Sequence, residues 1–295
     1  MHGREDAGEN GIIPFGFHTF VASLLNWFHS WYLPHTIKIH RDDYLATSIA
    51  KAKIWTMMIN HTNSADIVIT PSKHFRKKLI HYGTKKDIKV FPNGFPDSLF
   101  YKKATIKKLK PEEDLRIIWH SRVSSEKRII PFLEALTKIE KKYHLDIYGS
   151  GNEIYKAKLY AKKHRLSVRF HGNVKFKKLS DAINESHLDI LTSYNVDTFG
   201  MTLIEAEAFA TPVFFCDPDM QEIVPKGSYV LSPGPSPEQM AKTINNILKH
   251  PEKIQQMSEV MLEHREEVLI SKRIEILEKI FNSIISKHKK INLSK

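Results

Sequence analysis

Short apolar runs alternate with amphipathic stretches over most of the chain after residue 112. The apolar runs are rich in β-branched and aromatic residues, which is typical of buried strands. We expect strands at 115–120, 145–148, 168–171, 189–192, 212–216 and 229–231. The stretches between and after them predict helices near 127–141, 153–164, 179–185, 201–209, 237–248 and 251–289. This alternation indicates a doubly wound parallel sheet, which binds ligands at the carboxyl ends of its strands.

The part of the chain before residue 112 has fewer such units. We expect strands at 36–40, 65–70 and 88–91, and helices at 43–60 and 73–82, the second closed by Gly83. Residues 101–114 carry charge and no apolar face, which predicts a linker. The expected organisation is a shortened N-terminal domain over 1–108, a second domain over 109–270, and a C-terminal helix over 271–295 that is a candidate for packing back on the first domain.

The amino-acid composition indicates a class of protein and excludes others. The 295 residues are 41% hydrophobic and 26% charged, as in a soluble globular protein. The single cysteine excludes a disulfide framework and a multi-cysteine metal site. Because Cys216 lies in the apolar run 212–216 with no base close in sequence, we expect a buried strand thiol and not a nucleophile.

The net charge of +12 is concentrated in residues 1–111, which hold 17 Lys and Arg against 8 Asp and Glu. This excess suggests an anionic partner such as a lipid headgroup, a phosphorylated acceptor or nucleic acid, although a solvated lysine-rich surface explains it equally well. Nucleic acid is the weakest of these, because no motif for such binding is present. Residues 15–33 approach the length of a membrane span, but polar residues and Pro34 favour an interfacial or core helix.

Candidate chemistry follows four of the expected strands in the second domain. Arg122 and Lys127 lie in a loop that opens a helix, where cations and a helix N-terminus can bind phosphate. Gly149 follows the next strand, where its lack of a side chain lets a ligand approach or simply turns the chain. Asp197 and Glu205 follow the fourth strand, one in the loop and one in the next helix, and the acidic stretch from Asp217 to Glu222 follows the fifth strand. Each feature alone is also explained by solvated charge or by a turn.

The order of these features resembles glycosyltransferase family 4, retaining enzymes with the two-domain GT-B fold. The matching stretches are HSRVSSEK, DIYGSGN, VRFHGNV, DTFGMTLIEAEAFATPV and QEIV. Upstream, NSADIVITPS, LIHYG and KVFPNGFPDSLF resemble the end of the family's first domain. The resemblance implies an α/β protein of two Rossmann-type domains, the first one truncated. It also implies transfer of a hexose from a nucleoside diphosphate sugar to a glycan, lipid or other cell-envelope acceptor, with no metal or other cofactor.

The resemblance also implies roles for single residues. Arg122 and Lys127 hold the donor diphosphate and stabilise the departing nucleotide. Asp197 takes the first position of the family's E-x7-E pattern, near the hydroxyls of the transferred sugar, and Glu205 takes the second, near the ribose. His40 matches a histidine that reaches the acceptor and the sugar from the first domain. Further donor contacts are implied for Gly149, Val174, Phe199, Gly200, Met201, Thr202 and Glu222.

The sequence departs from the family pattern in three places. Asp197 is one methylene shorter than the usual Glu, and Ala210 and the pair Asp219-Met220 stand where glycines are common. The strand and glycine-rich loop that open the family's first domain have no counterpart, so we expect a fragment, a repacked N-terminal segment or a protein partner that completes the domain. The alternative function is a non-catalytic or partner-dependent sugar-nucleotide-binding subunit. We expect a cytoplasmic protein, with peripheral binding to the inner face of a membrane left open.

Overall fold

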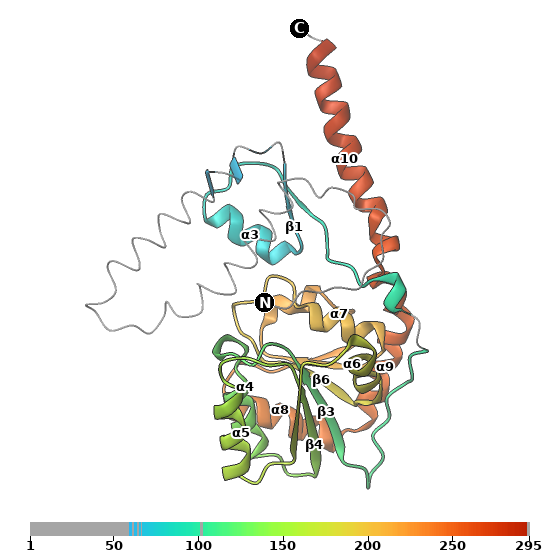
Figure 1. Cartoon of the computed structure of the whole chain (residues 1–295). Coiled ribbons are helices and arrows are strands. Elements are labelled where there is room, and N and C mark those ends of the chain that lie inside the picture. Colours follow the sequence, from blue (N-terminus) through green and yellow to red (C-terminus); the bar gives the residue numbers. More distant parts are fainter. Residues whose placement is uncertain (1–58, 61, 64, 66, 101–102, 294–295) are drawn as a thin grey trace, which may run out of the picture.

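The computed structural model describes residues 59–60, 62–63, 65, 67–100 and 103–293 (Figure 1). His40, the expected strand at 36–40 and the apolar segment 15–33 lie outside the described residues.

The described part of the first domain is one β-α-β unit. Strands β1 (Val68–Thr70) and β2 (Ile88–Val90) pair in parallel and flank α3 (Lys73–His81). Helix α3 begins at Ser72, whose hydroxyl accepts a hydrogen bond from Phe75 N at 3.3 Å. The helix is followed by Gly83 at φ 104°, as the sequence predicts. A small core of Val68, Phe75, Leu79 and Ile88 holds the unit together, and a 3-10 turn, η1 (Asp97–Leu99), leads away from it.

The second unit is the predicted doubly wound sheet. Its strands are β3 (Leu115–His120), β4 (Tyr143–Tyr148), β5 (Val168–Gly172), β6 (Leu188–Leu191), β7 (Val213–Phe215) and β8 (Tyr229–Leu231). Its helices are α4 (Ile129–Leu136), α5 (Ile154–Lys163), α6 (Phe176–Glu185), α7 (Met201–Ala208), α8 (Pro237–Lys249) and α9 (Glu252–His264). Short 3-10 segments are η2 (Ser125–Lys127), η3 (Pro218–Glu222) and η4 (Arg265–Val268). All strand pairs are parallel in the order β5-β4-β3-β6-β7-β8, so the order reverses between β3 and β6.

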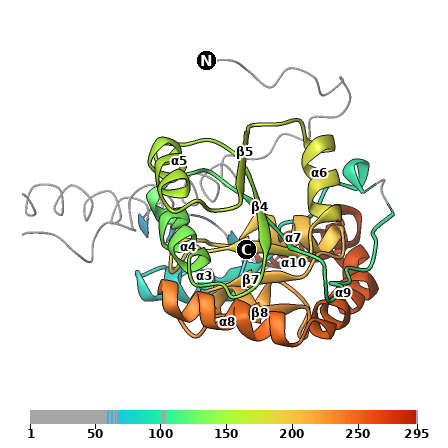
Figure 2. The ribbon, with the colours of Figure 1, turned by 90° about the horizontal axis from the view of Figure 1, so that it is seen from below.

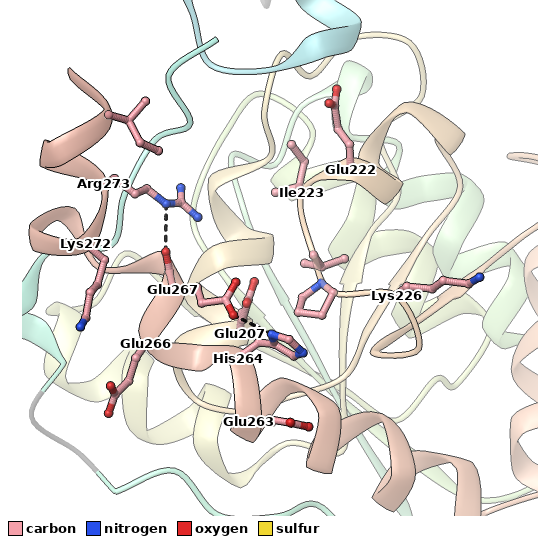
Figure 3. A pocket seen from close by; sticks show the side chains of 13 residues that line it. Glu207, Glu222, Ile223, Lys226, Glu263, His264, Glu266, Glu267, Lys272 and Arg273 are labelled. Carbon is pink, nitrogen blue, oxygen red and sulfur yellow. Dashed lines mark hydrogen bonds and ion pairs between the residues drawn. The ribbon is translucent and has the colours of Figure 1, made fainter. Parts of the chain in front are cut away.

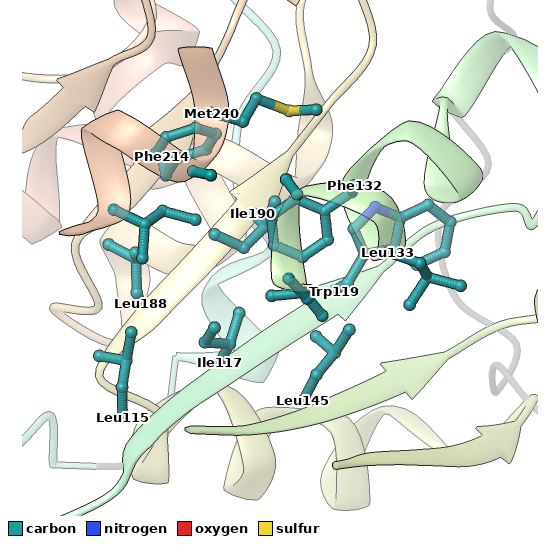
Figure 4. Packing of buried hydrophobic residues seen from close by; sticks show 14 of the residues in the cluster. Leu115, Ile117, Trp119, Phe132, Leu133, Leu145, Leu188, Ile190, Phe214 and Met240 are labelled. Carbon is teal, nitrogen blue, oxygen red and sulfur yellow. The ribbon is translucent and has the colours of Figure 1, made fainter. Parts of the chain in front are cut away.

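Alternate residues of the strands face the two sides of this sheet and build two cores. Leu115, Ile117 and Trp119 of β3 pack under α4 and α8, as Figure 4 shows, whereas Ile118 joins the core under α6 and α7. Viewed along the sheet, α4, α5 and α8 lie on one side and α6, α7 and α9 on the other (Figure 2). Both faces are therefore buried, which explains why the strands are nearly continuous apolar runs. The thiol of Cys216 is fully buried, as predicted.

Residues 103–110 differ from the predicted linker, because they pack along the second unit. Leu109 is buried in the core under α4 and α8, and Ala104 in the core under α6 and α7. The buried ammonium group of Lys107 donates to Phe209 O at 2.9 Å and Asn184 Oδ1 at 3.0 Å. Burial lowers the pKa of Lys107 to about 7. Apolar residues spaced along this charged stretch, Ala104 and Leu109, therefore anchor an extended segment to the second unit.

The C-terminal end of the chain contacts the segment that follows β2. Phe95 bridges to Leu269, with Phe95 N donating to Val268 O at 2.6 Å. Helix α10 (Ile270–Leu293) starts there, and Ser271 N donates to Asp97 Oδ2 at 3.1 Å. Beyond this start, α10 extends away from the sheet (Figure 1). None of the helices within the described residues is long and apolar enough to cross a membrane.

Candidate functional site

The loops after β3, β6 and β7 meet at the carboxyl edge of the sheet, beside the point where the strand order reverses. The first unit lies against this edge (Figure 1). Ser72 Oγ, at the start of α3, donates to Thr198 O at 2.5 Å, in the loop between β6 and α7. Ligands of doubly wound sheets bind at the carboxyl ends of the strands, so this edge is the candidate functional site.

Lys127 and Asp197 form an ion pair at this edge. Lys127 ends η2, and its Nζ lies 2.5 Å from Asp197 Oδ1, with side-chain exposures of 15% and 13%. Ser193 Oγ donates to the other oxygen of Asp197, and Thr192 Oγ1 donates to Lys127 O at 2.5 Å. The cation and the acid that the sequence assigns to diphosphate and sugar are therefore neighbours, and two residues at the end of β6 fix them.

Arg122 lies in the same loop but is paired differently. Its Nη2 is 3.0 Å from Glu126 Oε1, and that carboxylate also accepts from Ser124 Oγ at 2.6 Å. The Arg122 side chain is 40% exposed, so its field is screened more than that of Lys127. Glu126 was not among the predicted site residues, although its four-residue spacing from Arg122 is a signal for such a pair.

Glu205 is held by a histidine that the sequence did not single out. His120, the last residue of β3, places Nδ1 3.2 Å from Glu205 Oε2 and Nε2 2.6 Å from Asp189 Oδ2 on β6. Burial alone would lower the pKa of this imidazole, but the two carboxylates outweigh it and raise the pKa of His120 to about 10. The two carboxylates therefore favour the protonated form of the imidazole, while burial also raises the pKa of Asp189.

Glu222 reaches across to the first unit. Its Oε1 accepts from His74 N at 2.7 Å and lies 2.9 Å from His74 Nδ1, while Oε2 accepts from Lys73 N at 3.1 Å. The carboxylate therefore sits at the N-terminus of α3, where the helix dipole favours negative charge. His74 Nε2 lies 3.1 Å from Asp197 O, so this histidine joins both acidic loops. His74 was missed, because a contact between residues this distant in sequence leaves no local signal.

The remaining predicted residues lie at or just behind the edge. Gly149, at φ 121°, follows β4, and a Cβ there would lie 2.0 Å from Ser121 O. Gly200, at φ 71°, precedes the first residue of α7, and Thr202 in that first turn has a buried hydroxyl with no hydrogen-bond partner among the described residues. Met201 is 42% exposed, and Asn93 Nδ2 lies 3.5 Å from its sulfur. The side chains of Phe199 and Val174 pack in or against the core under α7.

This geometry agrees with a comparison against families of known proteins. Residues 101–261 match the family model of the group 1 glycosyl transferases. The chain belongs to this family. Its predicted resemblance to glycosyltransferases is thereby confirmed, and family 4 is compatible with the match. A comparison with curated proteins gave no match.

Solved glycosyltransferase structures share the fold. Sucrose-phosphate synthase from Thermosynechococcus elongatus superposes with a TM-score of 0.69 at 18% identity, covering 88% of this chain and 66% of that one. HepE from Anabaena, in complex with UDP and glucose, gives 0.65 at 19% identity, with 78% and 67% covered. The lipopolysaccharide outer core galactosyltransferase WaaB gives 0.62 at 18%, with 76% and 62% covered. This GT-B-like chain thus spans about two thirds of the length of these proteins.

The glycosyltransferase domain also has a hollow of about 940 Å³ between α7, η3, α9 and α10 (Figure 3). Charged residues line it, and several are already paired: His264 Nδ1 lies 2.8 Å from Glu267 Oε1, and Arg273 Nε donates to Glu267 O at 3.1 Å. Burial raises the pKa of Glu207 in its wall to about 8. Only Glu222 among the predicted site residues borders this hollow.

Proposed function

We propose that this chain transfers a hexose, with retention of anomeric configuration, from a nucleoside diphosphate sugar. The observation that carries the proposal is the grouping at one strand edge of a partly buried Lys127–Asp197 ion pair and a Glu205 in contact with the buried imidazole of His120. A nucleoside diphosphate sugar needs a cation for phosphate, an acid for sugar hydroxyls and an acid for the ribose. UDP and glucose are present in the structure of the similar HepE protein, which supports the same ligand class here.

The chemistry of this site follows from charge. When the bond between the sugar and the diphosphate breaks, negative charge develops on the departing phosphate oxygen. Lys127 and Arg122 stabilise that charge, with Lys127 the stronger because it is less exposed. The leaving phosphate then takes the proton of the acceptor hydroxyl on the same face of the sugar, so the scheme needs no protein nucleophile and no metal ion. The acceptor would be a glycan, a lipid or another cell-envelope component at the inner face of the membrane.

For sugar transfer to occur, the ammonium group of Lys127 must contact the donor diphosphate as well as Asp197. In the structure its ammonium group is paired with Asp197. We expect the diphosphate to share the ammonium group and the sugar hydroxyls to donate to Asp197, so that donor binding replaces one strong ion pair by two contacts. The pair therefore holds both side chains in the geometry that the donor needs, at little entropic cost on binding.

Sugar release from the donor tests the proposal without knowledge of the acceptor. The chain is incubated with α-linked UDP-, GDP- and ADP-sugars, and 1H NMR identifies the anomer that is released first. Slow hydrolysis to the α-anomer supports a retaining transferase. First release of the β-anomer contradicts retention.

A second candidate function is a donor-binding subunit that needs a partner. Donor binding without hydrolysis, and without transfer to acceptors in a cell-envelope extract, would support a role as a partner-dependent donor-binding subunit. Turnover in the ordinary range of about 1–1000 per second by the isolated chain would exclude it.

A further inference from the structure

A buried imidazole joins three elements of the second unit. His120 lies at the end of β3, Asp189 on the neighbouring β6 and Glu205 on α7. The side chains of His120 and Asp189 are 4% and 3% exposed, whereas Glu205 is 23% exposed. The cluster thus runs from the interior of the sheet to the surface of the candidate site.

The two ring nitrogens impose a protonation state on this cluster. Nε2 lies 2.6 Å from Asp189 Oδ2 and Nδ1 lies 3.2 Å from Glu205 Oε2. Ionised carboxylates only accept hydrogen bonds, so both contacts form together only when both ring nitrogens carry a proton. Asp189 and Glu205 are the titratable groups with which the imidazole bonds among the described residues, and both favour its charged form.

Each ring nitrogen of a buried imidazole needs a polar partner. Asp189, fully inside the sheet, supplies one of them. The second contact reaches outward and uses one oxygen of Glu205, which leaves Oε1 free of His120. A carboxylate fixed at one oxygen loses less rotamer freedom when a ligand binds the other.

We propose that His120 is a positioning residue for the donor nucleotide: by holding Glu205 Oε2, it presents Oε1 to the ribose hydroxyls. The inference rests on the proposed function, and it assigns to His120 a share of the discrimination between a ribose and a sugar that lacks these hydroxyls. Asp189 holds the other ring nitrogen of His120 inside the sheet and does not touch the ligand.

The test removes hydroxyls from the ligand as well as side chains from the protein. Isothermal titration measures the Kd of UDP, GDP and ADP and of their 2′,3′-dideoxy forms. The wild-type chain should prefer the ribose form of its nucleotide by at least about tenfold, because a hydrogen bond to a carboxylate is lost without the hydroxyls. His120→Gln and Glu205→Gln should each reduce this preference to about threefold or less. A glutamine amide carries both of its N–H donors on one nitrogen, so it does not span the two carboxylates as the two separate ring nitrogens of an imidazolium do.

His187→Gln is the matched control. His187 is also buried and near a carboxylate, with Nε2 3.7 Å from Glu113 Oε1, but it precedes β6 at the opposite edge of the sheet. This variant should keep the wild-type ratio. The double variant His120→Gln/Asp189→Asn leaves no unpaired buried acid and replaces His120→Gln if the single variant does not fold.

The outcomes separate the inference from the proposed function. If wild type binds with the ribose preference and the His120 variants keep it, His120 does not position Glu205 and the inference is overturned, while the proposed function stands. An equal loss of preference in His187→Gln would also overturn it, since the effect would then be general destabilisation. If the wild-type chain binds none of the three nucleotides, the proposed function and the inference both fail.

Discussion

Replacing Lys127 by Met tests the ion pair at the centre of the site. The Met side chain keeps most of the apolar stem but removes the ammonium group, so Asp197 loses the partner that lies 2.5 Å away. Because both side chains are largely buried, solvent screens this pair less than a surface pair. A hydrogen bond between charged groups contributes about 1.5–3 kcal/mol, and we expect the free energy of unfolding to fall by about that amount in the donor-free protein.

The same change should affect catalysis more than binding. If Lys127 stabilises the departing phosphate, its loss removes an interaction that strengthens in the transition state, and comparable losses cost roughly 100–1000-fold in kcat. We expect kcat for donor hydrolysis to fall by about this factor in Lys127→Met, with a smaller change in the Kd of the free nucleoside diphosphate.

A double-mutant cycle with Asp197→Asn separates the pair from its surroundings. Chemical denaturation of wild type, both single variants and the double variant gives the coupling energy, which we expect to be about 1.5–3 kcal/mol. Lys138→Met is the control, since Lys138 pairs with Glu238 at 3.1 Å and Glu134 at 3.7 Å on an exposed surface, where solvent screens such pairs and their loss should change stability much less. A coupling energy below about 0.5 kcal/mol would show that the ion pair contributes little to stability, and an unchanged kcat in Lys127→Met would show that Lys127 does not stabilise the departing phosphate.

Three further predictions follow from the same structure. Glu205→Ala should weaken nucleotide binding by about 10–150-fold, whereas Asp197→Ala should lower turnover more than nucleotide affinity; equal losses of UDP or GDP affinity in both variants would show that the division of roles is wrong. Hydrolysis and transfer should be unchanged by EDTA if lysine and arginine supply the charge stabilisation; abolition by EDTA with rescue by magnesium would contradict the scheme. Burial raises the pKa of Glu207 from 4.5 to about 8 in the folded chain, so the folded state keeps a proton that the unfolded state loses between these values, and stability falls as the pH rises through that window by on the order of a few kcal/mol. Glu207→Gln cannot titrate, so its Tm relative to wild type should be higher at pH 8 than at pH 5, and a difference independent of pH would contradict the assignment.

The second domain could be predicted from the sequence because its strands are buried on both faces. An apolar run such as 115–120 has no alternative to the inside of a parallel sheet, and β3 and β8 begin and end as predicted. Helix α4 ends at Leu136 instead of near residue 141. The cause is Asn245 of α8, which accepts from Glu140 N and donates to Lys138 O, each at 3.0 Å. Such a tertiary contact overrides the local helical pattern.

The site could be predicted in part. Lys127, Asp197 and Glu205 follow strands that the sequence locates, and parallel strands end at one edge, so their convergence follows from the topology. Their partners His120 and His74 were not predicted. In the sequence, His120 is only the polar last residue of an apolar strand. Its role depends on two acids contributed by β6 and α7. His74 depends on how the first unit docks, which no local pattern encodes.

Donor binding tests most directly whether the carboxyl edge of the sheet is the donor site. Thermal unfolding is followed for the wild-type chain and Glu205→Ala with UDP-, GDP- and ADP-sugars at increasing concentration. A ligand that binds only the folded state stabilises it by about 2.7 kcal/mol at 100 times its Kd. We expect one of the three nucleotide classes to raise the Tm of wild type progressively, and Glu205→Ala to need at least about tenfold more ligand for the same shift. No shift with any donor, or equal shifts in both proteins, would contradict the assignment of this strand edge as the donor site.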